Sequence, residues 1–147
     1  MKHILPSLVG SWALSRTIDN GCSMIGTATI ARRCGGQFDY REQGGLTLPD
    51  GRTVEAERRY LFAPEDAGFT VLFAETPPRL FHRVALEKLG PNLVGIGVHL
   101  CADDCYESHY EFRADGAFTV EHRVRGPRKR YAISSRYSRM AITASPA

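Results

Sequence analysis

Hydrophobic and polar residues alternate with a period of two along most of the chain. Between residues 23 and 33 the even positions hold Met24, Gly26, Ala28 and Ile30, whereas Thr27, Thr29 and Arg33 lie on the odd face. Residues 105–113 and 117–125 repeat the pattern, with Tyr, Phe and Val on even positions and Glu, Thr or Arg between them. Such alternation is typical of antiparallel strands that bury one face and leave the other in water.

Turn signals separate these segments at short intervals. Asp-Asn-Gly occupies 19–21, Pro-Asp-Gly 49–51 and Ala-Asp-Gly 114–116. The intervals predict about ten strands, near residues 11–18, 23–33, 37–46, 52–62, 69–75, 79–86, 94–101, 104–113, 117–125 and 129–142. We therefore expect an all-β fold in which residues 1–147 form one domain, a closed antiparallel up-and-down barrel. A short helical turn around residues 3–9 is expected to plug one end.

Composition supports a globular, turn-rich protein. Hydrophobic residues make up 43% and charged residues 24% of the chain, which is ordinary globular usage. No apolar run approaches the roughly 18 residues of a membrane helix, so we expect no membrane partner. The N-terminal apolar stretch is short and is broken by Pro6, which is weak as a signal peptide. The four cysteines form no C-x-x-C pair. We therefore expect a cytoplasmic protein with reduced thiols.

Charge is distributed unevenly along the chain. Residues 1–120 sum to −3, whereas residues 121–147 sum to +6. The basic end is compatible with an anionic ligand and equally with a solvated rim. The run Gly126–Arg130 has no aromatic residues interleaved with its basic ones, which argues against nucleic acid as the partner.

The apolar phase also places polar side chains inside the barrel. Three predicted inward arginines face two carboxylates, so one cation is in surplus, and six tyrosines share this interior. We therefore predict that the barrel binds a small polar or anionic molecule. The expected inward residues are Arg16, Tyr40, Glu42, Arg58, Tyr60, Asp104, Tyr106, Tyr110, His122, Tyr131, Tyr137 and Arg139. His82, His99 and Cys101 lie on strands whose two faces are both apolar, so they point inward only if their face is the inner one. Arg128 and Lys129 are expected at the rim.

Other functions stay open. A network of internal ion pairs and tyrosines would fill the barrel with no ligand but water. His99 and Cys101, with Asp104 or His109, would suit a zinc ion. An inward histidine, His82, His99 or His122, would suit haem iron. Inward histidines with Asp104 and Tyr106 would place an acid and a base in one cavity, as an enzyme requires. The cofactor is left undetermined, and a homo-oligomer is a further alternative.

Two sets of residues carry a family resemblance. Gly10-Ser11-Trp12 at the start of the first strand, with Arg139 near the end of the last, resembles the lipocalin-like (calycin) superfamily. This resemblance implies that the tryptophan packs under the arginine at the closed end of a barrel.

Further segments resemble an uncharacterised bacterial and fungal domain family with H-x-C-x-x-D-x-Y and G-P-R-K signatures. They are His99–Tyr110, Leu80–His82 and Gly126–Tyr131, followed by Tyr137–Arg139. The resemblance covers Trp12 to Arg139; it implies a fold and no activity.

Overall fold

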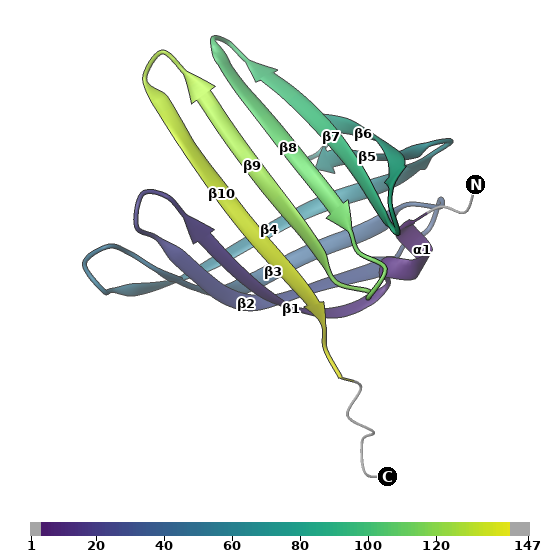
Figure 1. Ribbon diagram of the computed structural model, residues 1–147, viewed down its shortest axis with the longest axis horizontal. Helices are drawn as coiled ribbons and strands as arrows, with labels where there is room; N and C mark the ends of the chain where they lie inside the picture. Colours follow the sequence, from purple (N-terminus) through teal and green to yellow (C-terminus); the bar gives the residue numbers. More distant parts are fainter. Residues whose placement is uncertain (1–3, 142–147) are drawn as a thin grey trace.

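Ten antiparallel strands form a closed barrel in residues 4–141, the part of the chain that the computed structural model describes (Figure 1). The elements are α1 (Leu5–Leu8), β1 (Gly10–Ile18), β2 (Ser23–Arg32), β3 (Phe38–Thr47), β4 (Thr53–Glu65), β5 (Gly68–Phe73), β6 (Arg79–Leu89), β7 (Asn92–Cys101), β8 (Asp104–Phe112), β9 (Phe118–Gly126) and β10 (Lys129–Arg139). Each strand pairs with its neighbours in sequence, and β10 closes the barrel against β1. The predicted up-and-down barrel is confirmed.

The strand boundaries differ from the predicted ones by up to three residues. The largest extensions are at the ends of β4 and β6, which reach Glu65 and Leu89. β4 is long because its first ten residues pair with β3 and its last six with β5, the two sets overlapping at Tyr60–Phe62. His3, at the start of the predicted helical turn, and Ile142, at the end of the predicted last strand, lie outside the described residues.

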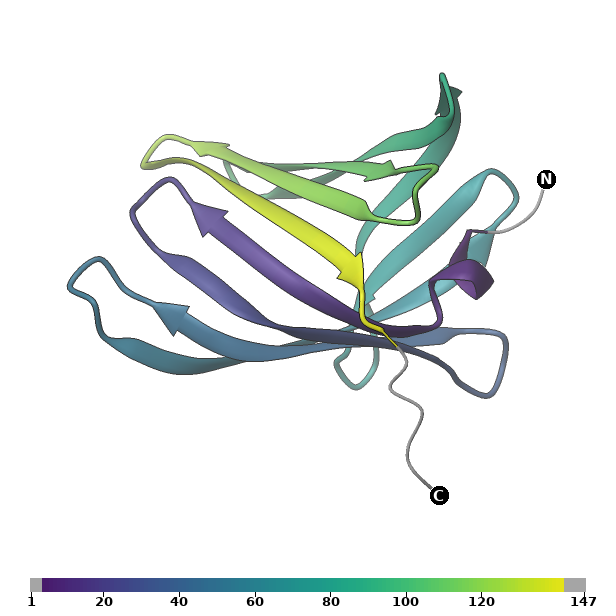
Figure 2. The same ribbon diagram turned by 60° about the horizontal axis from the view of Figure 1, so that its bottom comes forward.

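The short helix α1 lies at one end of the barrel (Figure 2), and Trp12 packs beside it in the core. The indole is fully buried, and its Nε1 donates a hydrogen bond to the carbonyl oxygen of Leu8 at 2.9 Å. The guanidinium carbon of Arg139 lies 4.1 Å from the centre of the Trp12 ring, as expected, and the arginine donates to the carbonyl oxygens of Ser7 and Val9. The end away from α1 carries the hairpin turns β1–β2, β3–β4, β7–β8 and β9–β10 (Figure 1).

A β-bulge interrupts the wall on the β5–β6 side. Val71 pairs with His82 and Leu72 with Leu80, so Phe81 is an extra residue in β6. A bulge re-aims side chains locally, and here the neighbouring Phe81 and His82 are both buried.

The pairing of β6 with β7 is incomplete. Their ladder extends from Leu89 and Asn92 only to Ala85 and Ile96. Beyond that point β7 follows β8 and diverges from β6 (Figure 1). The wall is therefore split near the open end, and the imidazole of His99 bridges the split through a hydrogen bond to the carbonyl oxygen of Phe81.

Two further expectations concern thiols and membranes. Cys22, Cys34, Cys101 and Cys105 are all free. Within residues 4–141, no helix has the length and apolarity needed to cross a membrane.

Candidate ligand-binding site

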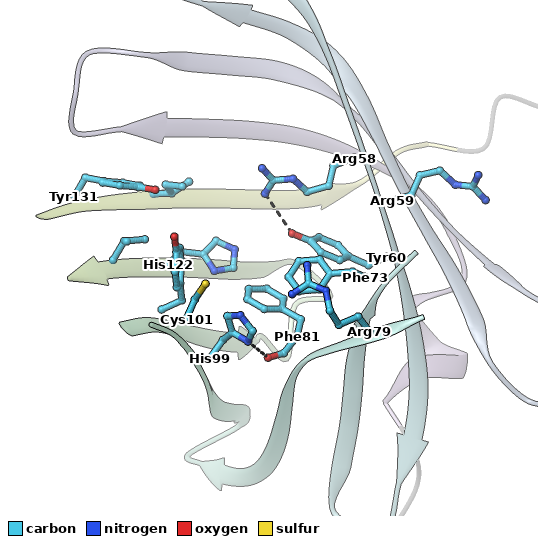
Figure 3. Close-up of a pocket in the computed structure, with 13 residues that line it drawn as sticks. Arg58, Arg59, Tyr60, Phe73, Arg79, Phe81, His99, Cys101, His122 and Tyr131 are labelled. Carbon is cyan, nitrogen blue, oxygen red and sulfur yellow. Dashed lines mark hydrogen bonds between the residues drawn. The ribbon is translucent and has the colours of Figure 1, made fainter. Parts of the chain in front are cut away.

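The barrel interior opens into a pocket of about 380 Å³ between strands β4 to β10, away from α1 (Figure 3). Six of the predicted ligand-binding residues line this open pocket: Arg58, Tyr60, His99, Tyr106, His122 and Tyr131. They come from β4, β7, β8, β9 and β10, whose inner faces meet at the same end of the barrel.

Aromatic rings form one side of the open pocket. Tyr60 and Phe81 are nearly parallel, with ring centres 5.8 Å apart and planes at 12°. Phe73 packs against Phe81 at 4.9 Å, and the guanidinium of Arg79 lies 4.4 Å from the Phe73 ring centre. Arg79 is itself paired with Glu75 at 3.1 Å on the exposed side. The pocket therefore offers a flat, largely apolar surface.

Below the open pocket, a buried polar network fills the barrel. Arg16 holds Glu42 through two hydrogen bonds of 2.5 and 3.0 Å and donates a third, of 2.7 Å, to Ser135. The Tyr40 hydroxyl donates its proton to Glu42 at 2.6 Å. In its hydrogen bond with Tyr137, also 2.6 Å, the Tyr137 hydroxyl is therefore the donor and Tyr40 the acceptor. The space left among these side chains is about 30 Å³, enough for no more than a few water molecules.

The charges of this network are balanced. Burial alone would raise the pKa of Glu42, but the hydrogen bond and charge of Arg16, together with the bond from Tyr40, lower it. Burial opposes the charged form of Arg16 too, but the hydrogen bond to Glu42, together with the electrostatic effects of Glu42, Tyr137 and Tyr40, outweighs it, so the pKa of Arg16 is raised. Burial raises the pKa of Tyr137 to about 12, which keeps its hydroxyl protonated. This half of the predicted polar interior is a satisfied structural network.

Arg58 is the inward cation in surplus. It lies opposite Glu42 in the β3–β4 register, but Glu42 already receives both of its close charged bonds from Arg16. Arg58 donates to the hydroxyl of Tyr60 at 3.3 Å and forms no ion pair with any residue in 4–141. Its side chain remains exposed and lines the open pocket (Figure 3).

Two histidines near the pocket are neutral. His122 bonds Ser108 through Nδ1 at 2.6 Å, and burial, then the charges of Arg16 and Arg58, lower its pKa to about 4. His82 bonds the hydroxyl of Tyr110 at 2.7 Å, and burial, then the nearby histidines, lower its pKa to about 3. Protonating His122 would place a positive charge near Arg16 and Arg58, and protonating His82 would place one in the buried wall.

Several predicted site residues do not line the open pocket. Arg16, Tyr40, Glu42 and Tyr110 lie in the filled region below it, and His82 packs inside the wall with 1% of its surface exposed.

At the rim, Lys129 contacts Asp104 at 3.3 Å and the Tyr106 hydroxyl at 3.4 Å, while Arg128 is exposed in the β9–β10 turn. The sequence pattern places Asp104 inside, but it pairs at this rim instead, because it is the first residue of β8. The pattern also directs Arg139 toward the cavity, but it caps the opposite end, because its register partner in β1 is Trp12.

Among the charged and aromatic lining residues, sequence reasoning misses Arg59, Phe73, Arg79 and Phe81. The run Phe69-Thr70-Val71-Leu72-Phe73 alternates, with the aromatic residues on odd positions, and could have revealed Phe73. No signal in the sequence indicates the bulge that turns Phe81 inward.

The geometry of the described residues gives limited support to two of the alternatives, a metal site and an enzyme. In the part of the chain that the structure describes, no three His, Cys, Asp or Glu side chains gather as a metal site requires. Ser108 hydrogen-bonds His122 but is fully buried, so its hydroxyl does not reach the pocket as a nucleophile would.

Comparison with known proteins gives a family and a few similar structures. Residues 8–139 match the family described as "Family of unknown function (DUF6314)". No curated protein matches the sequence. Among solved structures, a redesigned beta barrel, mFAP1, bound to DFHBI is 13% identical, with a TM-score of 0.47 over 94% of this chain and 100% of that chain. A de novo designed fluorescence-activating beta barrel is 16% identical, with a TM-score of 0.44 over 95% of this chain and 100% of that one.

Proposed function

The chain belongs to the DUF6314 family, whose function is unknown, and we propose from its site that the barrel binds a small polar or anionic molecule in the open pocket. The proposed ligand-contacting residues are Arg58, Tyr60, His99, Tyr106, His122 and Tyr131, with Lys129 at the rim.

The free guanidinium of Arg58 carries this proposal. An arginine beside an aromatic surface, with no carboxylate partner, presents several N–H donors that suit a carboxylate or phosphate. Arg16, by contrast, has the surroundings of a cation that stabilises the fold, because it is buried and donates two hydrogen bonds to Glu42. Arg58 has no such role within residues 4–141.

The competing explanation is that polar side chains fill the barrel for structural reasons alone. That explanation fits the lower region, where about 30 Å³ is left. It does not account for the open pocket, whose volume of about 380 Å³ is within the range of small-molecule sites. We therefore assign the two regions different roles: the filled polar region stabilises the fold, and the open pocket binds the ligand.

We also propose that the barrel is lipocalin-like. The sequential strand order and the arginine stacked on a tryptophan at the closed end support this relationship. In this interpretation Trp12 and Arg139 stabilise the closed end and take no part in binding.

The proposal is tested with Arg58→Met, which keeps much of the side-chain volume and removes the charge. Anilinonaphthalene sulfonate, an aromatic anion, serves as the probe. We expect its affinity to fall by the worth of a charged hydrogen bond, about 1.5–3 kcal/mol, while the melting temperature changes little. Arg41→Met is the matched control, because Arg41 pairs with Glu57 on the outer surface.

Arg16→Met gives the contrasting result. It leaves the buried Glu42 without its cation and should destabilise the fold by about 3–5 kcal/mol. If Arg58→Met destabilises the protein in the same way and the wild type does not bind the anion, Arg58 is structural and the proposal is wrong.

A further inference from the structure

Three chemically different surfaces meet in the open pocket, and together they specify more than an anion. Figure 3 shows Arg58 and Tyr60 on one side, the rings of Phe73 and Phe81 in the middle, and His99 on the other side. The inference drawn from them rests on the function proposed above and concerns the class of ligand.

The first surface recognises an anion. The Tyr60 hydroxyl accepts a hydrogen bond from Arg58 at 3.3 Å, so its own proton is free for a ligand oxygen. A guanidinium and a hydroxyl side by side suit the two oxygens of a carboxylate.

The second surface recognises a flat apolar group. Tyr60, Phe73 and Phe81 contact one another with ring centres 4.9–6.0 Å apart. These distances show that the rings pack together, leaving no slot between them. A ligand ring therefore stacks on the exposed edge or face of this cluster rather than inside it.

The third surface recognises a hydrogen-bond donor. His99 contacts the carbonyl oxygen of Phe81 through Nδ1 at 2.9 Å, and because a carbonyl can only accept, Nδ1 carries the proton. With the proton on Nδ1, Nε2 is left as an acceptor, and among residues 4–141 the hydrogen bond of this ring is the one that Nδ1 makes. The contacts of the ring with Phe73 and Phe81, at 5.9 and 5.4 Å, hold it in this orientation.

We propose that the ligand is an aromatic acid that carries a hydroxyl or amino group away from its carboxylate. The carboxylate binds Arg58 and Tyr60, the ring packs on Phe73 and Phe81, and the donor group binds Nε2 of His99. The split between β6 and β7 places His99 at this position, since the imidazole replaces the backbone pairing that is missing there.

Isothermal titration with a small probe set tests each contact separately. The probes are 3- and 4-hydroxybenzoate, benzoate, 4-methoxybenzoate and 4-hydroxybenzamide. We expect at least one hydroxybenzoate to bind wild-type protein about 10-fold or more tightly than benzoate, because benzoate lacks the hydroxyl that bonds His99. It should also bind more tightly than the amide, which lacks the negative charge that pairs with Arg58.

Two variants then assign the preferences to residues. Arg58→Met should abolish the preference for the acid over the amide, and His99→Phe should abolish the preference for the hydroxyl while keeping that for the acid. Arg41→Met should behave as wild type. If His99→Phe does not fold, two wild-type comparisons decide: each hydroxybenzoate with benzoate, and 4-hydroxybenzoate with 4-methoxybenzoate, because neither benzoate nor the methoxy compound has the donor.

The outcomes separate this inference from the function on which it rests. Equal binding of benzoate and both hydroxybenzoates overturns the donor site at His99 and leaves the anion pocket in place. Failure of every benzoate probe, while anilinonaphthalene sulfonate binds through Arg58, overturns the ligand class alone. Failure of all these probes overturns both.

Discussion

Arg16 and Arg58 both point into the barrel, and their different partners give them different roles. The guanidinium of Arg16 is buried and satisfied by Glu42 and Ser135. Within residues 4–141, the hydrogen bond and the cation–π contact of the Arg58 guanidinium are both with Tyr60. Counting inward charges in the sequence predicts that one cation is in surplus, but only the side-chain geometry identifies which arginine it is.

Trp12 is the residue whose loss should cost most stability at the closed end. It is fully buried, contacts Phe118 edge-on at 4.8 Å and supports both Leu8 and Arg139. We expect Trp12→Ala to lower the free energy of unfolding by about 3–5 kcal/mol, as for other large buried aromatic residues. Urea denaturation followed by circular dichroism measures this, and a loss below about 1 kcal/mol would show that Trp12 does not support this end of the barrel.

The neutral histidines predict that the protein becomes less stable as pH falls. An unfolded chain protonates its histidines near pH 6.5, whereas the folded protein keeps His122 neutral to about pH 4 and His82 to about pH 3. Between these values the unfolded state binds more protons, so stability decreases as pH is lowered through this range. Glu42, whose pKa is lowered, adds to the loss at the acidic end.

The size of this effect is measurable. One unit of pKa corresponds to about 1.4 kcal/mol, so acidification from pH 7 to pH 4.5 should destabilise the fold by on the order of 2 kcal/mol for each histidine. Urea unfolding at several pH values measures the slope. His122→Gln should reduce it, because Gln can still bond Ser108 without titrating. An unchanged slope in this variant would contradict the role given to His122.

At the scale of elements, the hydrophobic pattern of β6 and β7 does not indicate which face of each strand points into the barrel. The outer face of β7 carries Ile96, Val98 and Leu100, which are 51%, 52% and 71% exposed, while its inner face carries Gly95 and Gly97. This reverses the usual relation between hydrophobicity and burial. The alternation in β2, β8 and β9 gives their inward faces correctly because polar residues predominate on their outer faces.

Gly97 is needed because of the bulge in β6. A Cβ atom at this position would lie 2.6 Å from two atoms of the His82 ring, and His82 is only 1% exposed and has little freedom to move. We expect Gly97→Ala to lower the free energy of unfolding by about 1–3 kcal/mol through overpacking. Denaturation in urea provides the measurement.

Gly45→Ala is the matched control for this prediction. A Cβ atom there meets only the terminal methyl group of Thr53, which can rotate away. Combining Gly97→Ala with His82→Ala should remove the additional penalty of the methyl group. If Gly97→Ala is as stable as Gly45→Ala, the proposed contact between β6 and β7 is wrong.

At the scale of the whole molecule, the barrel divides into a base closed by α1 and Trp12, a filled polar middle and an open pocket. Sequence alternation predicts the barrel and most of the inward residues, because closure requires an apolar face on every strand. It does not predict how far each inward residue lies along the barrel axis. Glu42 and Tyr106 differ in this position: Glu42 lies in the filled region, where it stabilises the fold, and Tyr106 lines the open pocket.

Native mass spectrometry of freshly purified protein tests the central claim, that this open pocket holds a small molecule, most directly. Wild-type protein and Arg41→Met are expected to carry the same additional small mass, and Arg58→Met is expected to lose it or retain much less of it. If all three proteins instead show only the mass of the polypeptide, or if Arg58→Met retains the additional mass as fully as the wild type, the assignment of Arg58 as the anion anchor of a binding pocket is contradicted.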